Sequence, residues 1–169
     1  IFWAPPPVPL EQARAEIANP AAPSPQLSYH ISDNEWQTCP GGRVVTIDTI
    51  QFPATTISAA IVEVEPGAMR ELHWHPNADE WQYYLEGSAR MTVFDSSSLA
   101  RTFDYQAGDV GYVPKILGHY VENTGDGPMR FLALFRSPLY QDVSLTQWLA
   151  LTPPDLVKAH LNLSDKVIA

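Results

Sequence analysis

The sequence has little cysteine, little basic charge and no long apolar run. A single cysteine, Cys39, excludes an internal disulfide. No stretch approaches the roughly 18 apolar residues of a membrane-spanning helix, so we expect no membrane span. Lys and Arg number 10 against 19 acidic residues, which gives a net charge of −9. Phosphate binding requires clustered positive charge, so nucleic acid is not an expected partner.

The start of the chain lacks both a methionine and the charged beginning of a signal peptide. We therefore expect a processed form, a clipped fragment or an excised domain. The length of 169 residues, 45% of them hydrophobic, is enough for one domain with a core. The 16 prolines argue against a helical bundle and indicate many turns, because proline breaks helix interiors and central strands.

Three segments follow one another along the chain. Residues 1–31 are proline-rich and are predicted to form an extended arm. The arm is either a linker or a segment that packs on a neighbouring domain through Phe2 and Trp3. Residues 32–141 are predicted to form the folded domain, and residues 142–169 a helical tail.

The central segment consists of short strands separated by turn residues. Turn signals include Glu65-Pro66-Gly67 and Gly125-Asp126-Gly127-Pro128. In the second strand Ala60, Val62 and Val64 are expected to line one face. Short strands at this spacing predict an all-β sandwich or barrel. The predicted strands span residues 43–47, 59–64, 69–75, 80–86, 89–94, 101–105, 110–113, 119–122 and 129–135.

The tail changes from strand to helix periodicity. Ser144 followed by Gln147 resembles a capping box and predicts one helix start. Thr152, followed by two prolines, predicts a second start with Thr152 as the cap. Two short helices are therefore expected. One face of the second is predicted to carry four residues, Leu156, Val157, His160 and Leu161.

Three of the five histidines occur in an arrangement typical of a metal site. His73 and His75 are two apart on a predicted strand, so their side chains point to the same face. Glu80 opens the next strand and can face them, and His119 arrives on a later one. Three imidazoles and one carboxylate suit Mn, Fe, Ni, Cu or Zn rather than Ca or Mg. The alternative for each histidine alone is an ordinary polar residue of the barrel.

Two motifs resemble the signature of the cupin superfamily. The first combines Gly67, His73-Trp74-His75, Glu80 and Gly87 at the family's spacing, and the second combines Gly108, Pro114, His119 and Asn123. One departure is Ile116, which stands where many cupins have glycine. The resemblance implies a cupin double-stranded β-helix, or jelly-roll barrel, with the metal inside its mouth.

Longer stretches are similar to the second cupin half of bicupin oxalate decarboxylases, namely residues 66–77, 80–84, 89–94, 105–114, 118–123 and 142–149. This resemblance implies Mn²⁺ as the metal, held by His73, His75, Glu80 and His119, and oxalate as the substrate. It also implies another cupin barrel or a homo-oligomer as partner. Members of the family are often secreted or periplasmic, so either compartment is the expectation.

Two further residues match family positions next to the substrate. Arg70 matches an arginine that pairs with a substrate carboxylate, for which a guanidinium fork is well suited. The alternative for Arg70 is a surface salt bridge. Tyr140 matches a tyrosine near the site and is otherwise expected to be a buried core residue.

Ala133 departs from the family, which usually places an acid-base glutamate in this strand. Converting oxalate to formate and carbon dioxide requires a proton at carbon. The sequence therefore leaves three functions open: an oxalate decarboxylase, an oxalate oxidase that yields carbon dioxide and hydrogen peroxide, and a non-catalytic metal-binding half of a larger assembly. The carboxylates of Asp79, Glu86 and Glu122 are not placed at the substrate by sequence reasoning.

Overall fold

The computed structural model of the chain describes residue 11 and residues 27–168. Most of the predicted arm, including Phe2 and Trp3, lies outside these residues, and so do any contacts it makes. The described part begins with a single 3-10 turn, Ile31–Asp33, and continues into the strands. None of the described helices is both long and apolar enough to cross a membrane.

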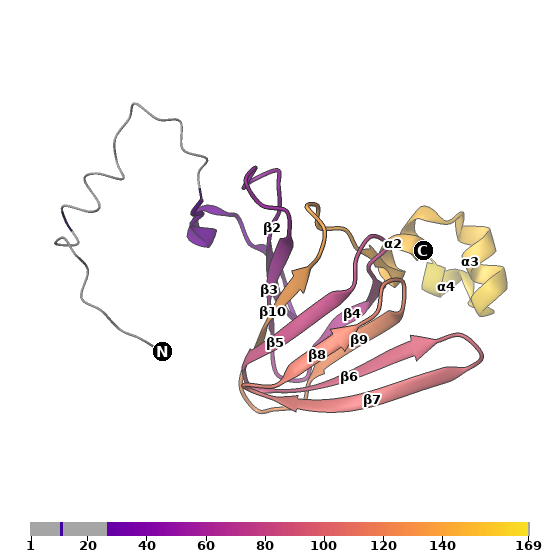
Figure 1. Cartoon of the computed structure of the whole chain (residues 1–169). Coiled ribbons are helices and arrows are strands. Elements are labelled where there is room, and N and C mark those ends of the chain that lie inside the picture. Colours follow the sequence, from indigo (N-terminus) through magenta and orange to yellow (C-terminus); the bar gives the residue numbers. More distant parts are fainter. Residues whose placement is uncertain (1–10, 12–26, 169) are drawn as a thin grey trace.

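Two antiparallel sheets face each other and enclose the core (Figure 1). The predicted all-β jelly roll is therefore confirmed. The six-stranded sheet has the order β1 (Gln37–Cys39), β2 (Gly42–Ile47), β3 (Ser58–Val64), β10 (Met129–Phe135), β5 (Glu80–Glu86) and β8 (Val110–Val113). The five-stranded sheet has the order β11 (Val143–Ser144), β4 (Met69–Trp74), β9 (Gly118–Asn123), β6 (Ser88–Asp95) and β7 (Leu99–Gln106).

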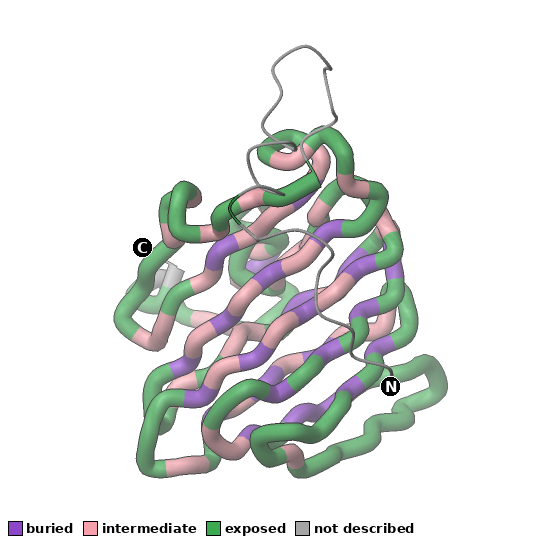
Figure 2. Tube along the Cα trace, turned by 60° about the vertical axis from the view of Figure 1, so that its left-hand side comes forward, coloured by how far each residue is buried: buried purple, intermediate pink, exposed green. Residues whose placement is uncertain are grey.

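Alternation of inward and outward side chains fixes the register of the central strands. Buried and less buried residues alternate along β3, β10 and β9, which Figure 2 shows as a stripe pattern across the sheet. Ala60, Val62 and Val64 are buried on one face of β3, as predicted. A slip by one residue would turn this apolar set outward, so burial of the face specifies the pairing. Sequence reasoning missed β1 and β11, which have only three and two residues.

The tail forms three helices where two were predicted: α2 (Leu145–Leu151), α3 (Pro154–Leu161) and α4 (Asp165–Ile168). Ser144 caps α2 as expected, because its hydroxyl accepts the N–H of Gln147 at 3.0 Å. The predicted cap at Thr152 is wrong. Its hydroxyl instead donates to the carbonyl of Trp148 in the preceding turn at 2.8 Å, so Thr152 ends α2, and Pro153 precedes α3 without a side-chain cap.

The predicted apolar face of α3 is turned toward α2. Four of its residues line one cavity together with residues of α2, namely Leu156, Val157, His160 and Leu161. The tail contacts the barrel at β4 and β11, where Trp148 of α2 meets Trp74 edge to face with ring centroids 5.8 Å apart.

Ile116, the departure from the cupin motif, has a left-handed backbone conformation with φ +67°. Its N–H donates to the carbonyl of the predicted ligand His75 at 3.0 Å, so the turn approaches the site. A β-branched residue in this region is strained, because its Cβ crowds the following carbonyl. The side chain is 64% exposed and gains little from burial. Strain therefore explains why glycine is common at this position.

We expect Ile116→Gly to raise the free energy of unfolding by about 0.5–1 kcal/mol, since relief of left-handed strain exceeds the added chain entropy of glycine. Urea unfolding of the two proteins measures the difference. Ile116→Ala keeps a Cβ and serves as the control. An equal gain in the alanine variant would show that side-chain exposure, and not the backbone, is responsible.

Candidate metal centre

Four predicted ligands converge inside the barrel. His73 lies on β4 opposite His119 of β9 in the strand register, His75 follows β4, and Glu80 opens β5. One ligand atom from each residue lies within 4.8 Å of every other. All four side chains are buried, with relative exposures of 1–3%. Pairing of β4 with β9 thus brings together residues 46 positions apart in the sequence (73 to 119), and Glu80 comes from the other sheet.

Three ligand atoms in this cluster are buried without a hydrogen-bond partner: His75 Nε2, His119 Nε2 and Glu80 Oε2. The two nitrogens lie 3.4 Å and 2.8 Å from the Glu80 oxygen, but their directions do not form hydrogen bonds. Buried polar atoms are almost always paired, so this convergence requires an additional partner. A cation bound among three imidazole nitrogens and a carboxylate supplies one, and the chain has a metal-binding site here.

Backbone carbonyls orient the three imidazoles. Each Nδ1 lies within hydrogen-bond distance of a carbonyl, so Nδ1 carries the proton and the Nε2 lone pair is left for a metal. The acceptors are the carbonyls of Glu71 for His73, Gln141 for His75 and Leu117 for His119, at 2.6, 2.8 and 3.1 Å.

The electrostatics of the cluster also favour metal binding. Burial and the nearby positive charge of Arg70 lower the pKa of His73 well below its ordinary value, so this imidazole is neutral and able to bind a cation. Burial alone would raise the pKa of Glu80, but the neighbouring imidazoles of His119 and His75 hold it well below its ordinary value. The carboxylate is therefore ionised, as a metal ligand must be.

Arg70 and Tyr140, the predicted substrate residues, lie next to this cluster. The Tyr140 ring packs edge-on against His75 with centroids 5.8 Å apart, and its hydroxyl lies 3.5 Å from Arg70 Nη2. Burial raises the pKa of Tyr140, so the phenol remains protonated and can donate. Arg70 also forms a partly buried ion pair, and Tyr140 packs against the core.

The ion-pair partner of Arg70 is Asp142, which sequence reasoning missed. Its Oδ2 pairs with Arg70 Nη2 and also accepts the hydroxyl of Tyr140 at 3.3 Å. The only available signal was its position two residues after Tyr140. That spacing indicates a contact with Arg70 only once the course of the turn after β10 is known.

The three carboxylates that sequence reasoning could not place take part in other interactions. Asp79 accepts the backbone N–H of Lys115 at 2.7 Å. Glu86 is exposed at the end of β5. Glu122 lies on β9, 3.9 Å from Arg90. None of them belongs to the group of four ligands found among the described residues.

Ala133 is buried in the wall of the barrel, with 1% exposure. It faces inward from β10 between Ala60 of β3 and Gln82 of β5. The other inward side chains of β10 are apolar: Met129, Phe131 and Phe135. This strand therefore carries no acid that could transfer a proton at the metal site.

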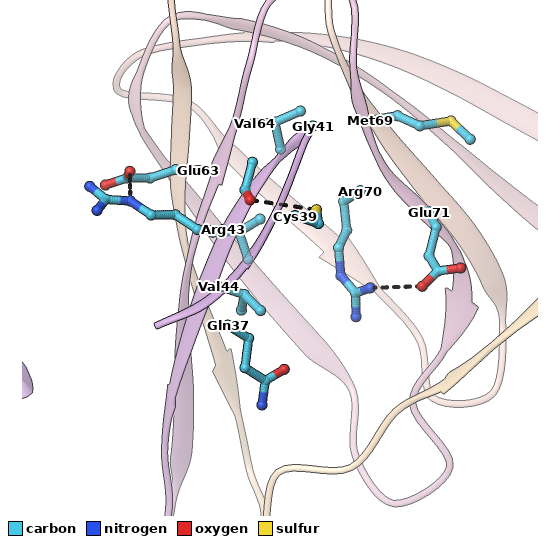
Figure 3. A pocket seen from close by; sticks show the side chains of 12 residues that line it. Gln37, Cys39, Gly41, Arg43, Val44, Glu63, Val64, Met69, Arg70 and Glu71 are labelled. Carbon is cyan, nitrogen blue, oxygen red and sulfur yellow. Dashed lines mark hydrogen bonds and ion pairs between the residues drawn. The ribbon is translucent and has the colours of Figure 1, made fainter. Parts of the chain in front are cut away.

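Arg70 also borders two cavities. The larger has a volume of about 440 Å³ and is lined by Gln37, Val44, Thr46, Arg70, Glu71, Tyr140, Asp142, Ser144 and Gln147. Figure 3 shows the smaller one, where the Arg70 side chain extends beside Val44 and Gln37 and pairs with Glu71. A third cavity, of about 220 Å³, is lined by two of the ligands, His73 and His119, so the cluster is bordered by cavities on more than one side.

Known proteins resemble this chain along most of its length. The model of the Cupin family matches residues 29–169. An oxalate decarboxylase from Bacillus subtilis is 54% identical over 155 residues, which are 91% of this chain and 40% of that protein. An oxalate decarboxylase from Arthroderma benhamiae is 47% identical over 83% of this chain and 34% of that protein.

Solved structures of oxalate decarboxylases also resemble this chain. A B. subtilis oxalate decarboxylase studied for its Mn(II) centres has a TM-score of 0.80 and 56% identity, covering 83% of this chain and 37% of that one. The formate complex of a Lactobacillus farciminis oxalate decarboxylase has a TM-score of 0.79 and 51% identity, covering 83% of this chain and 42% of that one. The chain spans about two fifths or less of the curated oxalate decarboxylases it matches.

We expect His75→Ala to abolish stoichiometric metal binding, because it removes one of the convergent nitrogens and leaves Glu80 with one imidazole fewer. Elemental analysis of the protein after loading with Mn²⁺ and desalting measures this loss. His160→Ala, on exposed α3, is the matched control and should retain the metal. Full stoichiometry in the His75 variant would show that the ligand set is wrong.

Proposed function

The chain belongs to the cupin family, and we propose that it is an oxalate decarboxylase-type cupin that uses manganese to convert oxalate to formate and carbon dioxide. The observation that carries the proposal is the buried three-histidine, one-glutamate cluster with Arg70 beside it. Identity of 54% with an oxalate decarboxylase supports it. Because the chain spans only part of such proteins, the activity proposed is that of the cupin unit described here.

Manganese is the metal we propose. The ligand set accepts Mn, Fe, Zn, Ni or Cu, and affinity alone favours the later metals. Similarity to an oxalate decarboxylase studied for its Mn(II) centres supports manganese in this chain. When bound, the metal would act as a Lewis acid that binds and polarises a carboxylate of the substrate.

The protein side chains have separate tasks in this proposal. The Arg70 guanidinium would bind a carboxylate of oxalate through charge-assisted hydrogen bonds. The Tyr140 hydroxyl, protonated because burial raises its pKa, has a single O–H, which it would turn from Asp142 to the same anion. The apolar wall formed by β3 and β10 would exclude bulk water and strengthen both interactions.

A second candidate reaction is the oxidation of oxalate by dioxygen to carbon dioxide and hydrogen peroxide. Ala133 favours it, because oxidation of both carbons to carbon dioxide requires no proton at carbon, and β10 offers no acid. A non-catalytic role as the metal-binding half of a larger protein is the outcome if neither reaction occurs. The coverage of only 40% of the Bacillus relative is compatible with that role.

We expect the manganese-loaded chain to convert carbon-labelled oxalate to labelled formate at mildly acidic pH. NMR follows the labelled products, and a peroxide assay runs in parallel. Peroxide without formate would show that the chain is an oxalate oxidase and not a decarboxylase. If neither product formed while manganese remained bound, the non-catalytic role would be correct.

We expect Ala133→Glu to increase formate production by about 100-fold, the lower limit of what a positioned general acid contributes. The initial rate of formate release at equal manganese content measures the effect. Ala133→Gln adds the same volume without an acid and is the matched control. Equal rates in both variants would mean that proton transfer from this strand does not limit the reaction.

A further inference from the structure

A single oxygen atom links the two residues proposed to contact the substrate. Asp142 Oδ2 pairs with Arg70 Nη2 and accepts the hydroxyl of Tyr140 at 3.3 Å. Arg70 comes from β4 and Tyr140 from the turn after β10, so Asp142 joins two separate elements. The side chain of Asp142 is 31% exposed and that of Arg70 only 16%, so water weakens this ion pair less than it weakens a surface pair.

Asp142 is itself held in place by the segment around it. The carbonyl of Gln141 accepts from the imidazole of His75, and Val143 and Ser144 pair with Trp74 and His73 as strand β11. Ser144 then caps α2. Residues on both sides of Asp142 are therefore fixed to the strand that carries the histidines. The backbone of Asp142 therefore cannot shift without disturbing this strand pairing.

The pairing leaves part of the guanidinium free for another anion. Only Nη2 of Arg70 contacts Asp142, so Nε and Nη1 keep N–H groups available. Glu71 lies 3.9 Å from Nη1 and is 39% exposed, so it is a weak competitor for these groups. Arg70, Tyr140 and Asp142 line the same cavity of about 440 Å³.

We propose that Asp142 is a positioning residue for a dicarboxylate, which holds Arg70 in the orientation that receives the carboxylate remote from the metal. The inference rests on the proposed action on oxalate. An arginine fixed in advance loses less rotational freedom on binding, so the affinity for an anion that reaches it rises. A monocarboxylate held by the metal alone gains nothing from this arrangement.

The test compares two anions in the manganese-loaded chain. Titration with oxalate and with acetate, followed by the Mn(II) electron paramagnetic resonance signal, gives both dissociation constants. Asp142→Ala should weaken oxalate binding by about tenfold, a loss typical of an outer partner in a metal site. Acetate binding should change by less than about twofold, and Asp142→Asn, which keeps an acceptor oxygen, should lie between Asp142→Ala and wild type.

Asp104→Ala, which removes the ion-pair partner of Arg90 and lies outside this cavity, is the matched control and should bind oxalate like the wild type. Equal weakening of both anions by Asp142→Ala would indicate a loosened site and overturn the inference. Unchanged or tighter oxalate binding would also overturn it. Unchanged binding would mean that Asp142 does not contribute to binding, and tighter binding would mean that it competes with oxalate for Arg70. If wild-type protein with full manganese does not bind oxalate, the proposed function is wrong, and the inference that rests on it is wrong as well.

Discussion

The structure depends above all on the burial of four polar side chains at one point of an apolar barrel. His75, His119 and Glu80 each present an atom without a hydrogen-bond partner, and such an atom costs about 1–3 kcal/mol when it is buried. The sheets that surround these groups offer apolar packing and no substitute partner. A bound cation offsets this cost, so stability of the barrel and occupancy of the site are coupled.

Strand β4 and the segment after β10 place the chemistry around this point. β4 supplies Arg70 and His73, and the later segment supplies Tyr140 and Asp142. They are joined by strand pairing, by an ion pair and by the bond from His75 to the carbonyl of Gln141. Residues 70 positions apart thus form one unit, in which metal ligands and anion-binding groups share a framework.

Local patterns predicted much of this architecture, and long-range contacts account for what was missed. Alternation along β3 predicted which of its side chains are buried, and the spacing of His73, His75 and Glu80 predicted that they face one another. Asp142 was missed because its partner is distant in sequence. The cap at Thr152 was wrong because its hydroxyl donates backward to the carbonyl of Trp148 and does not accept an N–H of the helix that follows, and the sequence does not distinguish these two local bonds.

The orientation of the imidazoles by main-chain carbonyls has an evolutionary consequence. Any residue at positions 71, 117 or 141 offers the same carbonyl, so drift in these side chains leaves the histidine tautomers intact. The metal-binding geometry is therefore robust to neutral substitution in its surroundings. Selection can change the cavity through Arg70 and Asp142, and the barrel wall through Ala133, while the set of metal ligands stays constant. Such a separation allows one barrel to diversify its reactions without rebuilding its metal site.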